Sequence, residues 1–169
     1  MEIWDILDEH GNKTGVTKVR GEKLEEGEYH LVVHVWTVNS KGEFLVSKRT
    51  PNKEWPLMWE TQSGSAASGE DSLTAALKET REEVGIVLNP ANGEYYCRVT
   101  RTDNICDVWI FRQDVELSDV VLQEGETCDA ALMSGEKILQ MIKEETFIGF
   151  EFYPYLLEMF EYLRKDLTR

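Results

Sequence analysis

Three glutamates, Glu79, Glu82 and Glu83, stand within five positions in the stretch GSAASGEDSLTAALKETREEVGI. At about 100° of rotation per residue, Glu82 lies about 60° to one side of Glu79 and Glu83 about 40° to the other, so a helix presents all three carboxylates on one arc. Like charges at these spacings destabilise an isolated helix. Two interpretations follow: a solvated face balanced by Lys78 and Arg81, or a site for Mg²⁺, which prefers oxygen ligands.

The loop ahead of this helix favours the metal-site interpretation. It is rich in glycine, serine and alanine, whose small side chains let backbone amides approach an anion closely. A carboxylate cluster beside such a loop is typical of a site that binds a metal ion and a phosphate together. Although the chain carries a net charge of −14, divalent cations neutralise the local field where a phosphorylated substrate binds.

The same segment resembles the signature of the Nudix hydrolases, G-x5-E-x7-R-E-U-x-E-E-x-G-U, in which U is an aliphatic residue. Two positions depart from it, because Lys78 stands in place of arginine and Thr80 in place of an aliphatic residue. Lysine keeps the positive charge but lacks the bidentate fork of arginine. The matching positions are Gly64, Glu70, Glu79, Glu82, Glu83, Gly85 and Ile86.

The resemblance implies an enzyme that cleaves a diphosphate linkage in a nucleoside diphosphate derivative with water, using Mg²⁺ or Mn²⁺ as its cofactor. It also implies that Glu79, Glu82 and Glu83 are catalytic residues and metal ligands. Glu70 is then expected to orient the loop or to lie in the outer shell of the metal, and Gly64 to permit close approach of the backbone.

The sequence leaves the general base open between two sources. Members of the family draw it from the signature helix or from a distant loop, and the acidic stretch LQEGETCD offers Glu124 and Glu126 for the second arrangement. Ordinary solvation of a loop explains these carboxylates as well. Glu126 is the candidate catalytic residue of this loop.

About half of the chain is also similar to the subgroup that includes the type I isopentenyl diphosphate isomerases. Those isomerases use a cysteine just before the signature glycine and a metal held by three histidines and two glutamates. Here Ser63 takes the place of the cysteine, and only His30 matches a ligand histidine, since Lys23 and Ser65 stand at the other two positions. We therefore expect hydrolysis, with isomerase-like activity and a non-catalytic nucleotide-binding module as the alternatives.

Cationic and aromatic residues outside the signature are candidates for substrate binding. Arg49 and Arg101 end expected strands, from which a cation reaches a phosphate, although surface ion pairing explains them equally. Trp55 and Trp59, in the loop before the site, are candidates for stacking on a base.

The elements that position these residues follow from the hydrophobic pattern. Apolar residues recurring every three or four positions predict a helix over 71–84, with Asp71 or Ser72 as its N-cap and Gly85 as the left-handed residue after its end. Residues 50–70 are expected to form a loop. Strands are predicted at 30–38, 43–49, 94–102, 107–115 and 129–133, and further helices near Ser134 and from about Tyr153.

This order, together with the resemblance, implies a Nudix-type α/β/α sandwich with a mixed central sheet. Two short runs around Gly11-Asn12-Lys13 add a small N-terminal hairpin. At 169 residues the chain fits one domain, 1–169. The three cysteines form no CxxC pair and are expected to be reduced and buried.

Charge and hydropathy restrict the partners. A net charge of −14 repels a nucleic acid backbone, and no apolar run approaches the length of a membrane span. The first residues lack the features of a signal peptide, so we expect a cytoplasmic enzyme. The expected partner is a small-molecule diphosphate, with no nucleic acid polymer and no membrane. The sequence does not distinguish a monomer from a homodimer.

Overall fold

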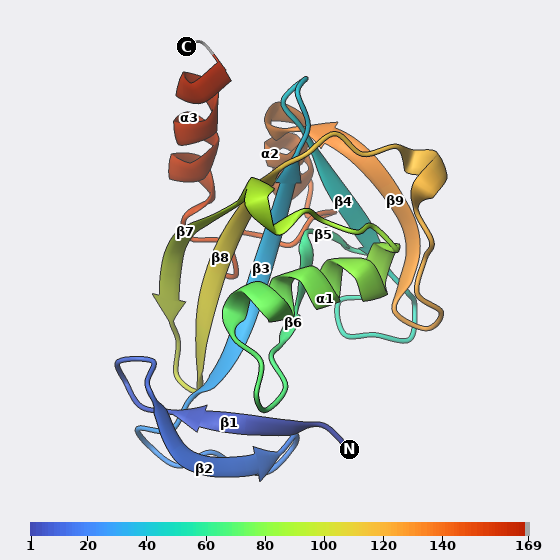
Figure 1. Cartoon of the computed structure of the whole chain (residues 1–169). Helices are drawn as coiled ribbons and strands as arrows, with labels where there is room; N and C mark the ends of the chain where they lie inside the picture. The colour runs from blue at the N-terminus through green and yellow to red at the C-terminus, as the bar shows by residue number, and fades with distance from the viewer. Residues whose placement is uncertain (168–169) are drawn as a thin grey trace.

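The computed structural model describes residues 1–167 as a mixed β-sheet with helices on both faces and a two-stranded hairpin at one end (Figure 1). Two short 3-10 turns, Pro90–Asn92 and Leu117–Asp119, lie on the connections that lead to β7 and β9. The helices are α1 (Ser72–Val84), α2 (Gly135–Lys143) and α3 (Leu156–Leu167). The strands are β1 (Ile3–Leu7), β2 (Lys13–Val19), β3 (His30–Val38), β4 (Glu43–Arg49), β5 (Trp59–Glu60), β6 (Gln62–Ser65), β7 (Gly93–Thr100), β8 (Asn104–Arg112) and β9 (Thr127–Ser134).

The large sheet mixes parallel and antiparallel pairs. Its main path runs β5-β4-β3-β8-β7, with β6 added to β3 and β9 added to β4. β3 and β8 run parallel from the pair His30 and Asn104 to the pair Val38 and Arg112, whereas the other pairs are antiparallel. The expected mixed sheet is confirmed.

Successive residues of β3 point to opposite faces of the sheet and so enter two separate cores. Val33 and Val35 pack on one face with Ala75 and Ala76 of α1. Trp36 packs on the other face, in a core that α2 and α3 complete. One helix on one face and two on the other confirm the expected α/β/α sandwich.

Helix α1 begins and ends where its caps predict. The Asp71 carboxylate accepts a hydrogen bond from the Thr74 backbone N–H at 2.7 Å, and Gly85 adopts the left-handed conformation with φ 71°. Thr80, which departs from the signature, is fully buried and donates its hydroxyl hydrogen bond to the Ala76 carbonyl at 3.0 Å. This bond explains how the helix buries a polar residue at an aliphatic position.

The prediction of a loop over 50–70 is wrong in its second half. β5 and β6 form there, pairing Glu60 with Ser47 of β4 and Gly64 with Val33 of β3. The segment lacks the alternation of apolar residues that identifies a strand, and its backbone becomes extended because neighbouring strands offer hydrogen-bond partners. β6 therefore places Gly64, the first residue of the signature, directly beside the central strand β3.

Three smaller expectations also need correction. The predicted strand 107–115 begins at Asn104, and α3 begins at Leu156 rather than near Tyr153. Cys128 is exposed, whereas Cys106 is buried and Cys97 half-buried. β9, which carries Cys128, pairs only with β4 among the described strands, and an edge strand leaves side chains open to solvent.

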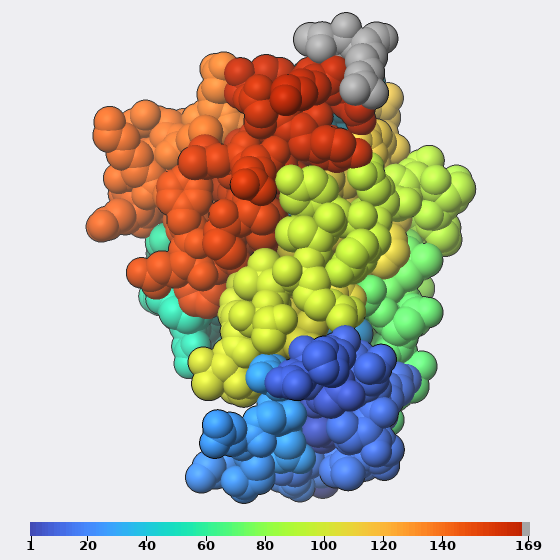
Figure 2. Space-filling model, turned by 90° about the vertical axis from the view of Figure 1, so that its left-hand side faces the viewer, coloured from blue at the N-terminus to red at the C-terminus, as the bar shows by residue number. Residues whose placement is uncertain are grey.

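The N-terminal hairpin of β1 and β2 is confirmed and closes one end of the molecule (Figure 2). Trp4 of β1 stacks on the His30 ring with 3.8 Å between ring centroids and 4° between planes. Leu7 and Tyr29 exchange backbone hydrogen bonds of 2.7 and 3.0 Å. The hairpin is thus fixed to the start of β3. No helix within residues 1–167 is long and apolar enough to cross a membrane.

Candidate active site

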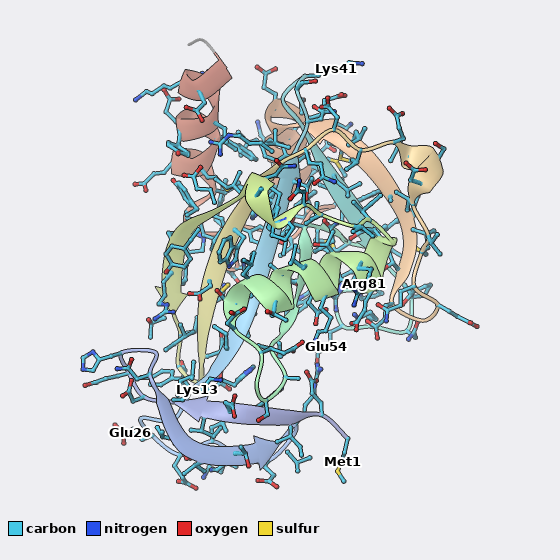
Figure 3. The ribbon with its side chains drawn as sticks, viewed as in Figure 1. Met1, Lys13, Glu26, Lys41, Glu54 and Arg81 are labelled. Carbon is cyan, nitrogen blue, oxygen red and sulfur yellow. The ribbon has the colours of Figure 1, made fainter. Side chains whose placement is uncertain are left out.

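The three signature glutamates line one side of a cavity of about 540 Å³, which we call the acidic groove. Gly64 and Lys78 line it as well, and the loop before β9 adds Glu126. Six residues singled out from the sequence are thereby brought together. Arg81, in contrast, is exposed on the outer side of α1 (Figure 3).

Gly64 permits the closest approach in the groove. A Cβ atom at this position would collide with the Glu79 carboxyl group, so that carboxyl group keeps its present position only if residue 64 has no side chain. The same collision would displace Glu79 from the groove. The requirement for glycine here is one of contact rather than of backbone conformation, because Gly64 does not have a positive φ.

Glu70 and Lys78 connect the loop to the helix. One Glu70 oxygen accepts the Ala67 backbone N–H at 2.6 Å and the Lys78 ammonium at 2.7 Å. Lys78 Nζ also lies 3.9 Å from a Glu79 oxygen. Lysine therefore takes part in the charge balance where the signature has arginine, as a point charge between two carboxylates.

Burial changes the acidity of two of the glutamates. It raises the pKa of Glu79 to about 7, against the opposing effect of Lys78 and with added repulsion from Glu82. It also raises the pKa of Glu83 well above its ordinary value, and Glu60 and Glu79 add to the rise. Crowded carboxylates that resist ionisation are a natural counterpart for a cation, since a bound ion favours their charged form.

The glutamates face the same groove without meeting at one point. Across the described chain, no three side chains of His, Cys, Asp or Glu converge closely enough to surround a single metal ion. Glu82 is exposed, whereas Glu83 and Glu79, which is directed toward Gly64, are half-buried. Rotation of flexible Glu side chains is therefore needed before two or three of them share an ion.

The acidic loop is fastened to the end of α1. Val121 N–H donates to the Val84 carbonyl at 2.9 Å, and Gln123 N–H donates to the Glu83 carbonyl at 3.2 Å. Glu126 forms an ion pair with Lys53 and lines the groove. Glu124 is exposed and is not among the residues that line it.

Sequence reasoning missed the contribution of the hairpin. The Asp5 carboxylate accepts a hydrogen bond from the Ser68 hydroxyl at 2.7 Å and one from the Gly69 N–H at 2.8 Å. Glu2 and Arg20 line the groove and pair with each other at 2.8 Å. No local pattern marks these residues, since only the packing of the hairpin brings them to the signature loop.

A second cavity, of about 430 Å³, opens beside the acidic groove and shares Arg20, Val32 and Ser63 with it. We call it the basic pocket because Arg49 and Arg101 line it together with Arg20. Its remaining lining includes Glu54, Glu60, Trp55, Phe152, Tyr153, His30 and His34. Glu54 lies below α1 in the loop after β4 (Figure 3).

Residues of the basic pocket are paired in a fixed arrangement. Arg49 donates to a buried Glu60 oxygen at 2.6 Å. His34 lies 2.8 Å from the Tyr155 hydroxyl, and burial lowers its pKa to about 3, so the imidazole is neutral. Trp59, expected at the site, lines neither cavity, and Lys48 lies 5.9 Å from the centre of its ring.

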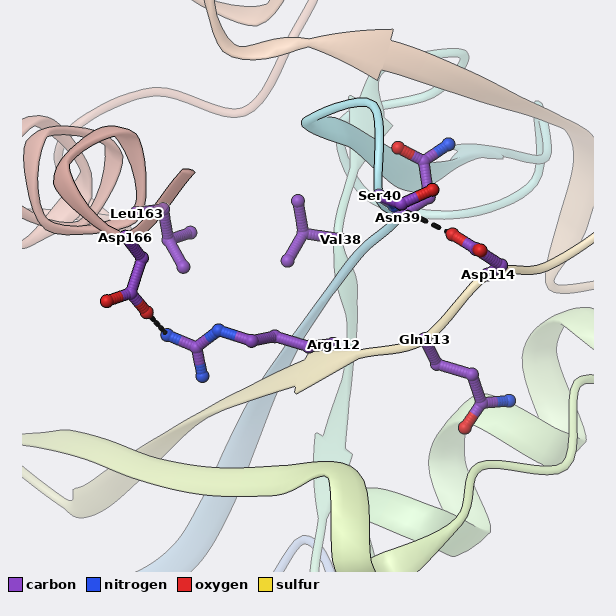
Figure 4. Close-up of a pocket in the computed structure, with 8 residues that line it drawn as sticks. All are labelled: Val38, Asn39, Ser40, Arg112, Gln113, Asp114, Leu163 and Asp166. Carbon is purple, nitrogen blue, oxygen red and sulfur yellow. Dashed lines mark hydrogen bonds and ion pairs between the residues drawn. The ribbon is translucent and has the colours of Figure 1, made fainter. Parts of the chain in front are cut away.

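A third cavity lies at the other end of β3, where Val38 and Leu163 face the ion pair of Arg112 and Asp166 at 2.5 Å (Figure 4). None of the residues that line it lines the acidic groove or the basic pocket. We therefore place the candidate active site at the two adjoining cavities.

Sequences of known proteins resemble this chain over most of its length. A model of the NUDIX domain matches residues 28–156. An uncharacterized Nudix hydrolase of Listeria monocytogenes is 38% identical over 161 residues, covering 94% of this chain and 95% of its own. An isopentenyl-diphosphate delta-isomerase of Escherichia coli is 26% identical over 138 residues, covering 75% of this chain and 76% of its own.

Solved structures share the fold. A Deinococcus radiodurans protein matches with a TM-score of 0.74 at 18% identity, covering 93% of this chain and 98% of its own. The NUDIX domain of Shewanella oneidensis NrtR, crystallised with ADP ribose, matches with a TM-score of 0.61 at 16% identity, covering 89% of this chain and 93% of its own.

Proposed function

The chain belongs to the Nudix hydrolase family, and from this premise we propose that it hydrolyses the diphosphate linkage of a nucleoside diphosphate derivative or a related small organic diphosphate. The observation that carries the proposal is the acidic groove, in which one helix, one glycine-containing strand and one distant loop meet. The ADP ribose bound by the NrtR domain, a diphosphate compound, supports this class of substrate.

We assign the binding of Mg²⁺ or Mn²⁺ to Glu79, Glu82 and Glu83. Their oxygens suit a hard divalent cation. Burial raises the pKa of Glu79 and of Glu83, and a bound cation would lower both pKa values because it favours the charged carboxylates. When bound, such an ion neutralises charge on the diphosphate oxygens and acidifies a water molecule. Lys78 holds Glu70 and stands beside Glu79, which keeps the loop and the carboxylates in register.

Glu126 is our candidate for the general base. It lines the groove together with the three glutamates of α1, and it forms an ion pair with Lys53, which lines the groove as well. A carboxylate that lines the same groove as the proposed metal ligands is available to accept a proton from water that attacks a bound diphosphate. Arg49, the last residue of β4, lines the basic pocket beside its ion-pair partner Glu60, and we expect it to contact the substrate there.

The isomerase alternative lacks a thiol in the described site. Ser63 faces the groove where the isomerases carry cysteine, and Cys97, Cys106 and Cys128 line neither cavity. A binding module without catalysis has no need for buried, repelling carboxylates, which destabilise the helix that carries them. Both features favour hydrolysis.

A product screen tests the proposal. Purified protein is incubated with a panel of diphosphate compounds and Mg²⁺, beside the variants Glu82→Gln and Glu83→Gln and the exposed-surface control Glu158→Gln. We expect cleavage of at least one compound, a loss of turnover on the order of a hundredfold in the two groove variants, and full turnover in the control. Unchanged rates in both groove variants, or binding without any product, would reject hydrolysis at this site.

A further inference from the structure

The two adjoining cavities carry opposite charge. Five carboxylates line the acidic groove against three cations, whereas three arginines line the basic pocket against two carboxylates. In a chain with a net charge of −14, a concave surface with excess positive charge stands out from its surroundings. A cation belongs in the first cavity, and an anion belongs in the second.

Arg101 is the source of the excess charge. Arg20 is paired with Glu2 and Arg49 with Glu60, at 2.8 and 2.6 Å. Arg101 instead donates to neutral oxygens, the Phe152 carbonyl at 2.6 Å and the Asn104 side chain at 3.3 Å. Among the ion pairs of residues 1–167, none joins Arg101 to a carboxylate, although its side chain is half-buried.

These two hydrogen bonds hold the Arg101 guanidinium at a fixed orientation while leaving its charge uncompensated. Neutral acceptors satisfy its N–H groups without neutralising it, and a partly desolvated charge gains most from an opposite charge. His34 adds no charge of its own, because burial keeps it neutral. Arg101 is therefore prepared for an anion that is not part of the chain.

An aromatic wall stands beside this charge. The Arg101 guanidinium lies 6.0 Å from the centre of the Phe152 ring, and Phe152 meets Trp55 edge to face at 4.8 Å. Trp55 is 48% exposed and has a φ of 47°, which non-glycine residues rarely adopt. An exposed tryptophan on a strained loop is consistent with a surface that covers a ligand.

We propose that the basic pocket binds a second anionic group of the substrate, a phosphate or a carboxylate, through Arg101, with the adjoining apolar or planar part against Phe152 and Trp55. This inference rests on the proposed function, since the diphosphate itself occupies the acidic groove. The substrate class is then narrowed to diphosphates that carry a further negative group beyond the cleaved linkage. The shared edge at Ser63 and Val32 lets one molecule span both cavities.

A binding experiment tests the pocket independently of catalysis. Inorganic phosphate and acetate are titrated by calorimetry into the full-length protein in the presence of EDTA, so that neither a divalent cation nor turnover is involved. We expect binding of one of the two anions, weakened at least tenfold in Arg101→Gln and unchanged in Arg164→Gln, which removes an exposed arginine of α3. The anion that binds more tightly identifies the group as phosphate or carboxylate.

A kinetic experiment then links the pocket to the substrate. Two nucleoside diphosphate compounds that differ by one additional phosphate are compared, and Arg101→Gln is expected to lower kcat/KM at least tenfold for the one with the extra phosphate and less than threefold for the other. Arg101→Lys and Trp55→Ala provide a second test if Arg101→Gln fails to fold, with intermediate losses of anion affinity expected. The proposal would be overturned by an absence of anion binding, by equal anion affinity in all variants, or by equal losses of kcat/KM for both compounds. The calorimetric experiment tests the pocket even if the protein hydrolyses none of the compounds.

Discussion

The acidic groove and the basic pocket differ in how the chain builds them. The groove takes most of its carboxylates from thirteen residues of one helix, α1, whose turn alone brings Glu79, Glu82 and Glu83 to one side. The pocket takes its arginines from segments far apart in the sequence, after β2, in β4 and after β7. A reactive centre is thus encoded locally, whereas the surface expected to select the substrate depends on the whole sandwich.

The two regions also differ in their dependence on conditions. Glu79 has a pKa raised to about 7, so the charge of the groove changes near neutral pH, while arginine remains charged at any pH that the protein tolerates. A bound cation would relieve the repulsion among the carboxylates of the groove, whereas the arginines of the pocket are charged without any bound ion. Variants that affect one region and leave the other intact can separate these roles.

Among variants that leave every groove carboxylate in the chain, the largest effect is expected from Gly64→Ala. The added methyl group collides with the Glu79 carboxyl group and displaces it, which should lower kcat about 10–100-fold by analogy with the loss of a metal-orienting contact. Steady-state kinetics at saturating Mg²⁺ measures the loss. Gly149→Ala is the matched control, because the nearest atom to its new Cβ lies 3.9 Å away. Full activity of Gly64→Ala would show that Glu79 can be moved freely.

The second prediction concerns His34 of the basic pocket and the way the stability of the protein depends on pH. His34 has a folded pKa of about 3 and an ordinary value of 6.5, so between these two pH values only the unfolded chain takes up the proton. Stability is unaffected by His34 above pH 6.5 and falls as the pH drops below it, by about 2 kcal/mol at pH 5. Urea unfolding at pH 7 and pH 5 should show this loss in the natural chain relative to His34→Gln. Equal pH dependence in both would contradict a neutral, buried His34.

A smaller effect is expected at Lys78. Removing its charge in Lys78→Gln frees Glu70 and Glu79 from their common partner and should lower kcat/KM about tenfold, mainly through weaker metal binding. The variant Lys78→Arg retains the charge and should stay within threefold of the natural chain. Titration of activity with Mg²⁺ measures both. If Lys78→Gln binds Mg²⁺ normally, the ion pairs serve only the stability of the helix.

The smallest effect is expected from Asp5→Ala, which removes the side-chain hydrogen bonds between the hairpin and the signature loop and leaves the backbone bond from Ser68 N–H to the Ile3 carbonyl. Loss of the two hydrogen bonds to Ser68 and Gly69 should lower the free energy of unfolding by about 1 kcal/mol and speed hydrogen exchange at the Gly69 amide. The partners also lower the pKa of Asp5, so their stabilisation is present above pH 3.8 and is lost as the pH falls through the lowered value. Unaltered exchange at Gly69 would mean that the loop holds its shape without the hairpin.

Patterns within short segments predicted much of the fold. The helix over 71–84, the hairpins and the helix after Ser134 were all recognisable from local hydrophobic period and caps, and the structure confirms them. β5 and β6 were not, since their residues are polar and irregular and become extended only by pairing with β4 and β3. The local pattern also does not predict the contribution of Asp5, Glu2 and Arg20 to the site, because their role depends on contacts with residues far along the chain.

The amino-acid sequence by itself determined the family of the protein and the face on which Glu79, Glu82 and Glu83 lie, because a helical turn fixes which residues share a side. Only the tertiary structure decided that Glu126 lines the same groove as these glutamates, that Trp59 lines neither cavity, and that Arg101 lines a neighbouring pocket with its charge uncompensated. Such contacts depend on the register and packing of strands that are distant in the chain, and no local spacing records them.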